Sequence, residues 1–239
     1  MFVGFFIMAE RNKPPAASKN EVSAFLEKVA RTPVKASGER GRLIFSLDAT
    51  ASREPTWDTA CQLQAEMFKE TGNLGGLSIQ LCYYRGFKDF YAGDWCDDAH
   101  ALLKQMTSVR CLGGQTQILR ILHHALTETK KKKVQALVFV GDAMEEDVDA
   151  LCHAAGQLGL LNVPVFVFQE GNHPAVRAAF QQIARLSGGA YAPFDINSAS
   201  QLRALLSAVA IFAAGGRKAL ADFSKRSGGD VLLLTKQLK

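Results

Sequence analysis

The chain has 239 residues, of which 48% are hydrophobic and 21% are charged, and this composition suits one sizeable globular domain with appendages. The formal net charge is +5 at pH 7, and the basic residues are scattered apart from Lys130–Lys133 and the two terminal segments. A nucleic-acid-binding surface usually concentrates basic charge and interleaves it with aromatic residues, so the composition argues against that class.

The first segment, residues 1–37, is predicted to be an N-terminal arm with one short helix. Its start, MFVGFFIM, is too short to span a bilayer and lacks the basic region and cleavage site of a signal peptide. We therefore expect translation to begin at Met8. Residues 9–20 are polar with two adjacent prolines, which predicts a flexible arm, and a short helix is predicted over 20–31.

The main domain, predicted over 38–214, alternates strand-like and helix-like segments. Three of its strand-like runs are continuously apolar, which fits strands that are covered on both faces of a sheet. The segment 85–94 is predicted to double back as a short antiparallel edge strand, because Gly86 permits a tight turn. The predicted strands are 43–47, 77–84, 136–140, 163–168 and 190–194.

Helices are predicted between and after these strands, because apolar residues recur there at spacings of three and four. Strands that alternate with helices indicate an α/β fold, a doubly wound and mostly parallel sheet with helices on both faces and right-handed crossovers. The last segment, 215–239, is predicted to be a tail that packs on the sheet, with a docking segment as the alternative. The predicted apolar helix faces are Trp57, Ala60, Cys61 and Met67; Ala99, Leu102, Leu103 and Met106; Val148, Leu151, Cys152 and Ala155; Val176, Phe180 and Ile183; and Leu202, Leu205, Leu206, Val209 and Phe212.

The five cysteines indicate the cellular compartment in which the protein is expected. Their number is odd and none forms a C-x-x-C pair, so no disulfide framework is expected. A reducing cytoplasm is the simplest location, and no membrane association is expected.

Three loops at the carboxyl ends of the predicted strands carry side chains with oxygen atoms. In an open α/β sheet, ligands bind at this edge. Asp48, Thr50 and Ser52 follow the first strand in the sequence DATAS, Thr116 lies in LGGQTQI, and Asp142 follows the third strand in FVGDAMEE. If the strands 43–47 and 136–140 are neighbours, the three loops meet at one point.

Carboxylate and hydroxyl oxygens are hard ligands that suit Mg²⁺, with Mn²⁺ or Ca²⁺ as alternatives. If neutral hydroxyls contact the ion directly, the ion keeps much of its positive charge and can take a carboxylate from a partner. Each residue also has a purely structural interpretation. Asp48 could cap a turn, Thr116 could be a helix N-cap, and Asp142 could cap the helix that begins near Glu145.

This order of motifs resembles the von Willebrand factor type A (VWA) domain, whose metal-ion-dependent adhesion site (MIDAS) combines an Asp-x-Ser-x-Ser loop, a later threonine and a later aspartate. The resemblance covers about residues 41–214. It implies that Mg²⁺ is held by Asp48, Thr50, Ser52, Thr116 and Asp142. Thr50 replaces the commoner serine, and the third loop reads GDAMEE where many relatives have an aspartate followed by glycine.

The resemblance further implies a Rossmann-like fold and a non-enzymatic module that binds an acidic side chain of a partner protein. Intracellular relatives often belong to multiprotein assemblies, some of which contain ATPases. One alternative is a metal-dependent phosphohydrolase of the haloacid-dehalogenase type, but that chemistry needs a second acid where this chain has Thr50. A scaffold whose site stays empty is the other alternative. The acidic cluster Glu145–Asp149 is interpreted as favourable charge at a helix N-terminus, with a role around the metal as the alternative.

Overall fold

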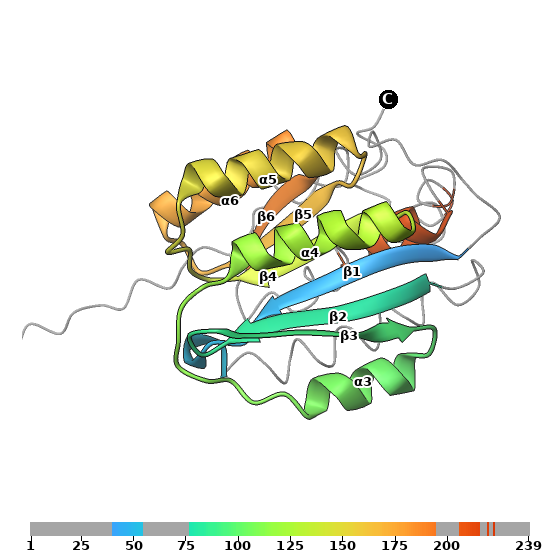
Figure 1. Ribbon diagram of the computed structural model, residues 1–239, viewed down its shortest axis with the longest axis horizontal. Helices are drawn as coiled ribbons and strands as arrows, with labels where there is room; N and C mark the ends of the chain where they lie inside the picture. The colour runs from blue at the N-terminus through green and yellow to red at the C-terminus, as the bar shows by residue number, and fades with distance from the viewer. Residues whose placement is uncertain (1–39, 55–76, 195–205, 216–218, 220–221, 223–239) are drawn as a thin grey trace, which may run out of the picture.

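The computed structural model describes residues 40–54, 77–194, 206–215, 219 and 222. Its centre is a six-stranded sheet with the strand order β3-β2-β1-β4-β5-β6 (Figure 1). The strands are β1 (Gly41–Asp48), β2 (Leu77–Arg85), β3 (Asp89–Cys96), β4 (Ala136–Gly141), β5 (Val165–Glu170) and β6 (Ala190–Phe194). The helices are the 3₁₀ turn η1 (Ala51–Arg53), α3 (Ala99–Thr107), α4 (Ile118–Lys131), α5 (Val148–Leu160) and α6 (Pro174–Leu186), and residues 206–215 are also helical.

The strand pairing confirms the predicted sheet. β1 lies between β2 and β4 and is parallel to both, as are β4 with β5 and β5 with β6. β3 is the antiparallel edge strand, and it pairs with β2 across the turn at Gly86. Two strands start two residues away from their predicted positions: β1 begins at Gly41 rather than at residue 43, and β5 begins at Val165 rather than at residue 163. Pro164 lies before β5 and has no N–H to donate to a neighbouring strand.

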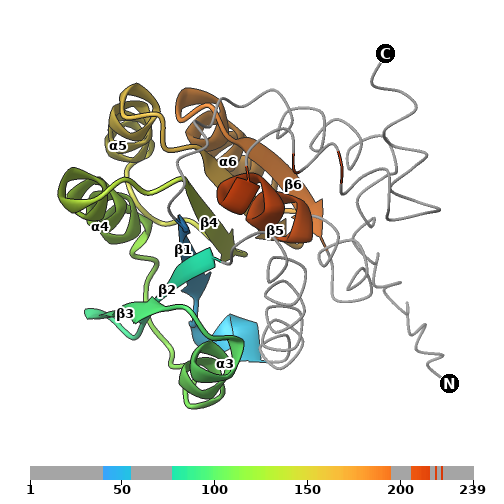
Figure 2. The ribbon, with the colours of Figure 1, turned by 90° about the vertical axis from the view of Figure 1, so that its right-hand side faces the viewer.

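Helices cover both faces of the sheet, and the sheet separates the core into two halves (Figure 2). Successive side chains of a strand point to opposite faces, so Leu43, Phe45 and Leu47 pack with α3 and the helix 206–215, whereas Ile44 packs with α4, α5 and α6. β1, β4 and β5 are buried along almost their whole length. The central strands therefore hold their carboxyl ends in fixed positions.

The predicted helix faces on α5 and α6 are confirmed, and on α3 Leu102 and Met106 are buried. Three positions of the final predicted face, Leu206, Val209 and Phe212, are also buried. Several predictions lie outside the described residues: the face from Trp57 to Met67, the side chain of Ala99, Leu202 and Leu205, the N-terminal arm with its helix, and the tail apart from Gly215, Ala219 and Asp222. The cysteines of the described part, Cys82, Cys96, Cys111 and Cys152, are all free thiols. Within that same part, no helix is both long and apolar enough to cross a membrane.

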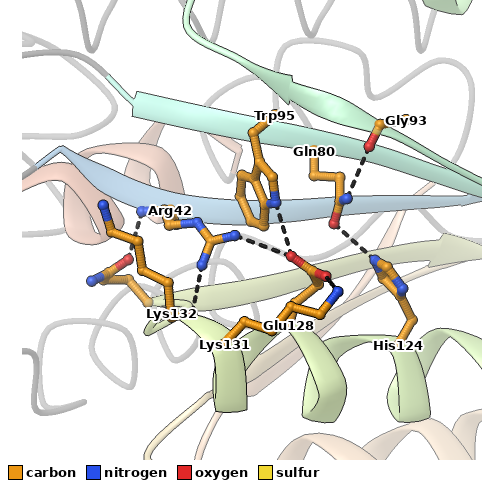
Figure 3. Close-up of polar contacts among 9 residues, drawn as sticks. Arg42, Gln80, Gly93, Trp95, His124, Glu128, Lys131 and Lys132 are labelled. Carbon is orange, nitrogen blue, oxygen red and sulfur yellow. Dashed lines mark hydrogen bonds and ion pairs between the residues drawn. The ribbon is translucent and has the colours of Figure 1, made fainter.

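A buried polar cluster fastens α4 to the sheet (Figure 3). The Glu128 carboxylate pairs with the Arg42 guanidinium at 3.1 Å and accepts a hydrogen bond from Trp95 Nε1 at 3.0 Å. Arg42 also lies over the Trp95 ring, 3.7 Å from its centroid. One turn earlier on α4, His124 Nε2 lies 2.8 Å from Gln80 Oε1. The C-terminal half of α4 is thus joined to β1, β2 and β3.

Candidate metal-binding site

The first and third predicted loops leave the sheet at the same edge, because β1 and β4 before them are neighbours in register, and the second loop reaches this edge through the bridge between Leu112 and Thr50. Asp48 at the end of β1 is paired with Tyr84 of β2, and Leu47 is paired with Val140 of β4. A Cβ atom added to Gly141, at the end of β4, would lie 3.5 Å from the Cβ of Asp48. The ends of β1 and β4 therefore meet, as the prediction of a shared site required.

The first loop brings together the three side chains predicted from DATAS. Asp48 is 0% exposed, and its Oδ1 accepts a hydrogen bond from the Thr50 N–H at 2.8 Å. Its Oδ2 accepts a hydrogen bond from the hydroxyl of Tyr84 at 3.0 Å. The hydroxyls of Thr50 and Ser52 lie 3.1 Å apart, which holds both at the start of η1. Asp48 does cap a turn, but a carboxylate has about four acceptor positions, so two remain for another ligand.

The second loop is joined to the third through Thr116. The Thr116 hydroxyl donates a hydrogen bond to Glu146 Oε2 at 2.6 Å and accepts one from the Glu145 N–H at 3.0 Å. Its own N–H donates to Glu145 Oε2 at 3.1 Å. A hydroxyl has one donor and two acceptor positions, so one lone pair of Thr116 remains for a cation. The interpretation of Thr116 as a helix N-cap is wrong, because Gln117 occupies that position of α4.

The two glutamates divide the acidic cluster into two roles. Glu146 Oε1 accepts a hydrogen bond from the Leu119 N–H at 2.8 Å. Glu146 therefore accepts hydrogen bonds both from the first turn of α4 and from the Thr116 hydroxyl. Burial raises the pKa of Glu146, and its hydrogen bonds from Thr116 and Leu119 oppose that rise. The expected helix-terminus role holds for Asp147, which is the N-cap of α5 and accepts a hydrogen bond from the Ala150 N–H. For Glu145 and Glu146 the alternative, a role around the candidate site, fits the contacts.

In the third loop, one oxygen of Asp142 has no donor. Asp142 Oδ1 is buried and finds no hydrogen-bond partner among the described residues. The proposed capping role for Asp142 is wrong, since Asp147 caps α5. Burial raises the pKa of Asp48, and the negative charge of Asp142 adds to that rise. A buried oxygen without a partner is costly, and a cation placed between these two carboxylates would offset that cost.

Arg53 is a buried cation in the first loop that sequence reasoning missed. It is 1% exposed and forms an ion pair with Glu170 at the end of β5. Burial lowers the pKa of its guanidinium, and the negative charges of Asp142 and Asp48 oppose that change. Arg53 thus ties the first loop to β5 and partly balances the carboxylates. An arginine between a hydroxyl-rich loop and a glutamate gives no sign of burial in the sequence alone.

The donors present suit a hard cation that retains water. No group of three or more His, Cys, Asp or Glu side chains is arranged for a metal ion in the described part of the chain. A cation at this edge would therefore depend on the hydroxyls of Thr50, Ser52 and Thr116 and on water, with Asp48 and Asp142 supplying negative charge. Mg²⁺ binds in this way, because it dehydrates reluctantly and keeps several waters. The five predicted residues therefore fit the Mg²⁺ ion that the sequence resemblance implied.

No protein-family model matches the sequence, and no curated protein matches it either. Solved structures do match the fold. The VWA domain of SpRpn10 aligns with a TM-score of 0.55 over 72% of this chain and 95% of that chain, at 13% identity. The chain has the VWA fold.

Two further VWA-fold matches carry metal ions. Proximal thread matrix protein 1 from the mussel byssus, with zinc in its MIDAS motif, aligns with a TM-score of 0.59 at 14% identity, over 74% of this chain and 46% of that chain. Manganese-loaded TRAP protein from Plasmodium vivax aligns with a TM-score of 0.53 at 15% identity, over 72% of this chain and 75% of that chain. At these identities the likeness establishes the fold, and the five site residues stay predictions.

Proposed function

We propose that this protein is a metal-dependent protein-interaction module rather than an enzyme. In this proposal Mg²⁺ is held by the hydroxyls of Thr50, Ser52 and Thr116, with Asp48 and Asp142 contributing negative charge directly or through water. The observation that carries the proposal is the buried Asp142 Oδ1, which has no hydrogen-bond partner among the described residues and lies in the loop next to the buried Asp48. Two metal-carrying structures of the same fold support it.

The metal would keep a coordination position for a carboxylate from a partner protein. Neutral hydroxyl ligands leave the charge of a divalent cation largely unbalanced, so an anionic oxygen from outside is attracted. We infer a partner that presents an Asp or Glu side chain, within an assembly that includes an ATPase. The phosphohydrolase alternative gains no support from the fold.

Metal titration tests the first half of the proposal. We expect the wild-type protein to release or absorb heat on binding Mg²⁺ or Mn²⁺ in isothermal titration calorimetry, and Asp48→Ala to show no binding heat. Asp149→Ala is the matched control, because it removes one carboxylate from an exposed position on α5 and should bind as the wild type does. Equal binding by Asp48→Ala, or no heat from the wild type, would contradict the proposal.

Chelator-sensitive capture tests the second half. The immobilised protein is incubated with native lysate in Mg²⁺ and eluted with EDTA, in parallel with Thr116→Ala. We expect proteins that elute from the wild type and are absent from the variant. If every captured protein also binds Thr116→Ala, the metal is not the link to the partner. Phosphatase turnover that is abolished in Asp48→Ala would instead favour a catalytic role.

A further inference from the structure

Two large apolar side chains stand exposed beside the candidate site. Phe87 is 70% exposed in the turn between β2 and β3, and Leu112 is 48% exposed in the second loop. An exposed apolar residue is by itself unremarkable, since much of any protein surface is apolar. Phe87 and Leu112 are of interest because the backbone places both near the residues that would hold the metal.

Backbone hydrogen bonds fix Leu112 and Phe87 to the rim of the site. Leu112 forms a parallel β-bridge with Thr50, and its N–H donates to the Ala49 carbonyl at 3.1 Å. The Gly86 N–H donates to the Leu112 carbonyl at 3.4 Å, which brings the β2–β3 turn and therefore Phe87 to the same loop. This turn and η1 lie at the same end of the sheet (Figure 1). The backbone carrying both side chains is thus already ordered before a partner binds.

Four basic residues come from the segments that carry or adjoin this apolar pair. Arg85 ends β2 and Lys88 lies in the β2–β3 turn, whereas Arg110 lies in the segment between α3 and α4 and Arg120 lies in the first turn of α4. The Arg85 guanidinium pairs with Asp89 at 2.6 Å and donates to the Arg110 carbonyl at 3.0 Å. Arg120 donates to the Lys88 carbonyl at 2.9 Å. Asp89 is the single acid of residues 85–89 and 110–120 and is paired with Arg85, so these two segments carry four basic residues against one acid, while Glu145 and Glu146 of the third loop contact Thr116.

We propose that Phe87 and Leu112, with these four basic residues, form a docking surface that reads the residues next to the partner's carboxylate. The occupant is a segment of a partner protein in which an Asp or Glu has an apolar neighbour and further acidic residues. This inference rests on the proposed function, since the metal supplies the first contact. A metal ion accepts any accessible carboxylate, so the apolar contact supplies the selectivity and the basic charge accelerates association with an acidic segment.

Selection from a random peptide library displayed on phage tests the inference. The library is bound to the wild-type protein in Mg²⁺ and eluted with EDTA. We expect the selected peptides to share an Asp or Glu beside an aromatic or branched aliphatic residue, with net negative charge. The dissociation constants of these peptides are then measured by fluorescence anisotropy. We expect binding about tenfold weaker in the double variant Phe87→Ser/Leu112→Ser, because it loses two partly buried apolar contacts.

The matched control is Leu160→Ser/Leu186→Ser, which removes two exposed leucines that lie at the C-terminal ends of α5 and α6. This control should bind the peptides as the wild type does. The Phe87→Ser/Leu112→Ser variant should retain the heat of Mg²⁺ binding, since neither side chain carries an oxygen ligand. It should also keep the wild-type free energy of unfolding and the wild-type mass in light scattering.

Each other outcome separates this inference from the function on which it rests. Selected peptides that share only a carboxylate, and bind both variants equally, would overturn the docking surface and leave the metal-dependent function standing. Peptides that bind in EDTA and bind Asp48→Ala equally well would overturn the function itself. A change in mass or in unfolding free energy of the Phe87→Ser/Leu112→Ser variant alone would mean that a second copy or another segment of the chain covers the surface, which also overturns the inference.

Discussion

His124 is held in one hydrogen-bonded arrangement on α4. Gln80 Nε2 donates to the Gly93 carbonyl at 2.8 Å, so the Gln80 amide oxygen faces His124 and accepts from its Nε2–H. The His124 ring also lies against Phe90, with the ring centroids 5.7 Å apart. Burial lowers the pKa of His124 below its ordinary value of 6.5, an effect that the negative charge of Glu128 opposes. The folded state therefore favours the neutral ring.

This burial predicts a stability that depends on pH. The unfolded chain binds a proton near pH 6.5, whereas the folded protein binds it only at lower pH. The contribution of His124 is thus present above pH 6.5 and is lost as pH falls towards the lowered pKa. Urea unfolding across this range should show a smaller loss of unfolding free energy in His124→Gln than in the wild type. The exposed His123→Gln on the same helix is the control, and an unchanged slope in His124→Gln would contradict the prediction.

Some residues of the candidate site could be predicted from the sequence and others could not. Asp48, Thr50 and Ser52 could be identified because their spacing is local and the buried strand before them is easy to recognise. Tyr84 could not, since its hydroxyl bonds Asp48 from 36 positions away. Glu145 and Glu146 contact Thr116 from 29 and 30 positions away. Such contacts follow from the strand order, which a single sequence does not display.

At the level of the elements, the two glycines before Thr116 have different roles. Gly113 and Gly114 both stand before Thr116 in the sequence LGGQTQI. A Cβ atom on Gly114 would lie 1.9 Å from the Gly86 carbonyl oxygen, whereas a Cβ atom on Gly113 would meet nothing within 4 Å. Only Gly114 is therefore required for the close approach of the second loop to the β2–β3 turn.

We expect Gly114→Ala to force these two segments apart. Because the obstructing atom belongs to the backbone, the loss of unfolding free energy should be about 1–3 kcal/mol. The displacement should also weaken Mg²⁺ binding, since Thr116 follows two residues later and Leu112, two residues earlier, bridges to Thr50. Thermal unfolding and Mg²⁺ calorimetry measure the two effects.

Gly113→Ala provides the matched comparison for this element. With open space around the added methyl group, its stability should lie within about 0.5 kcal/mol of the wild type and its Mg²⁺ affinity should not change. If the two alanine variants behaved alike, the tight contact between Gly114 and Gly86 would not be the feature that positions the second loop.

Across the whole molecule, α4 is held at two separate ends. Its N-terminus is fixed by Glu146 at the candidate metal site, and its C-terminal half is fixed by the pair Arg42–Glu128 beside Trp95 (Figure 3). Eleven residues separate Gln117 from Glu128, and at a rise of 1.5 Å per residue the two ends lie ~16 Å apart. Stability supplied by the cluster and affinity supplied by the site should therefore respond separately to substitution.

Arg42→Met tests this separation. Both partners of the pair are buried, but Glu128 also pairs with Lys131 at 2.8 Å, so the substitution removes one of two cationic partners and should reduce the unfolding free energy by about 1–3 kcal/mol. That loss is measurable against the 5–15 kcal/mol typical of a domain. The Mg²⁺ affinity of the folded variant should stay within about twofold of the wild type, because the cluster lies ~16 Å along α4 from the N-terminus of the helix. Urea unfolding and calorimetry on the same preparation give both quantities.

The exposed pair Arg40–Asp97, 2.7 Å apart, supplies the comparison that decides whether burial is the cause. Its side chains are about half exposed, so Arg40→Met should change the unfolding free energy by about 0–1 kcal/mol. Arg40 lies only two residues before Arg42, which matches the chemistry and the region of the two substitutions. If Arg42→Met cost no more than Arg40→Met, the cluster would not anchor α4. If it lowered Mg²⁺ affinity in proportion to stability, α4 would couple the two ends, and the metal site would depend on the whole helix rather than on its first turn.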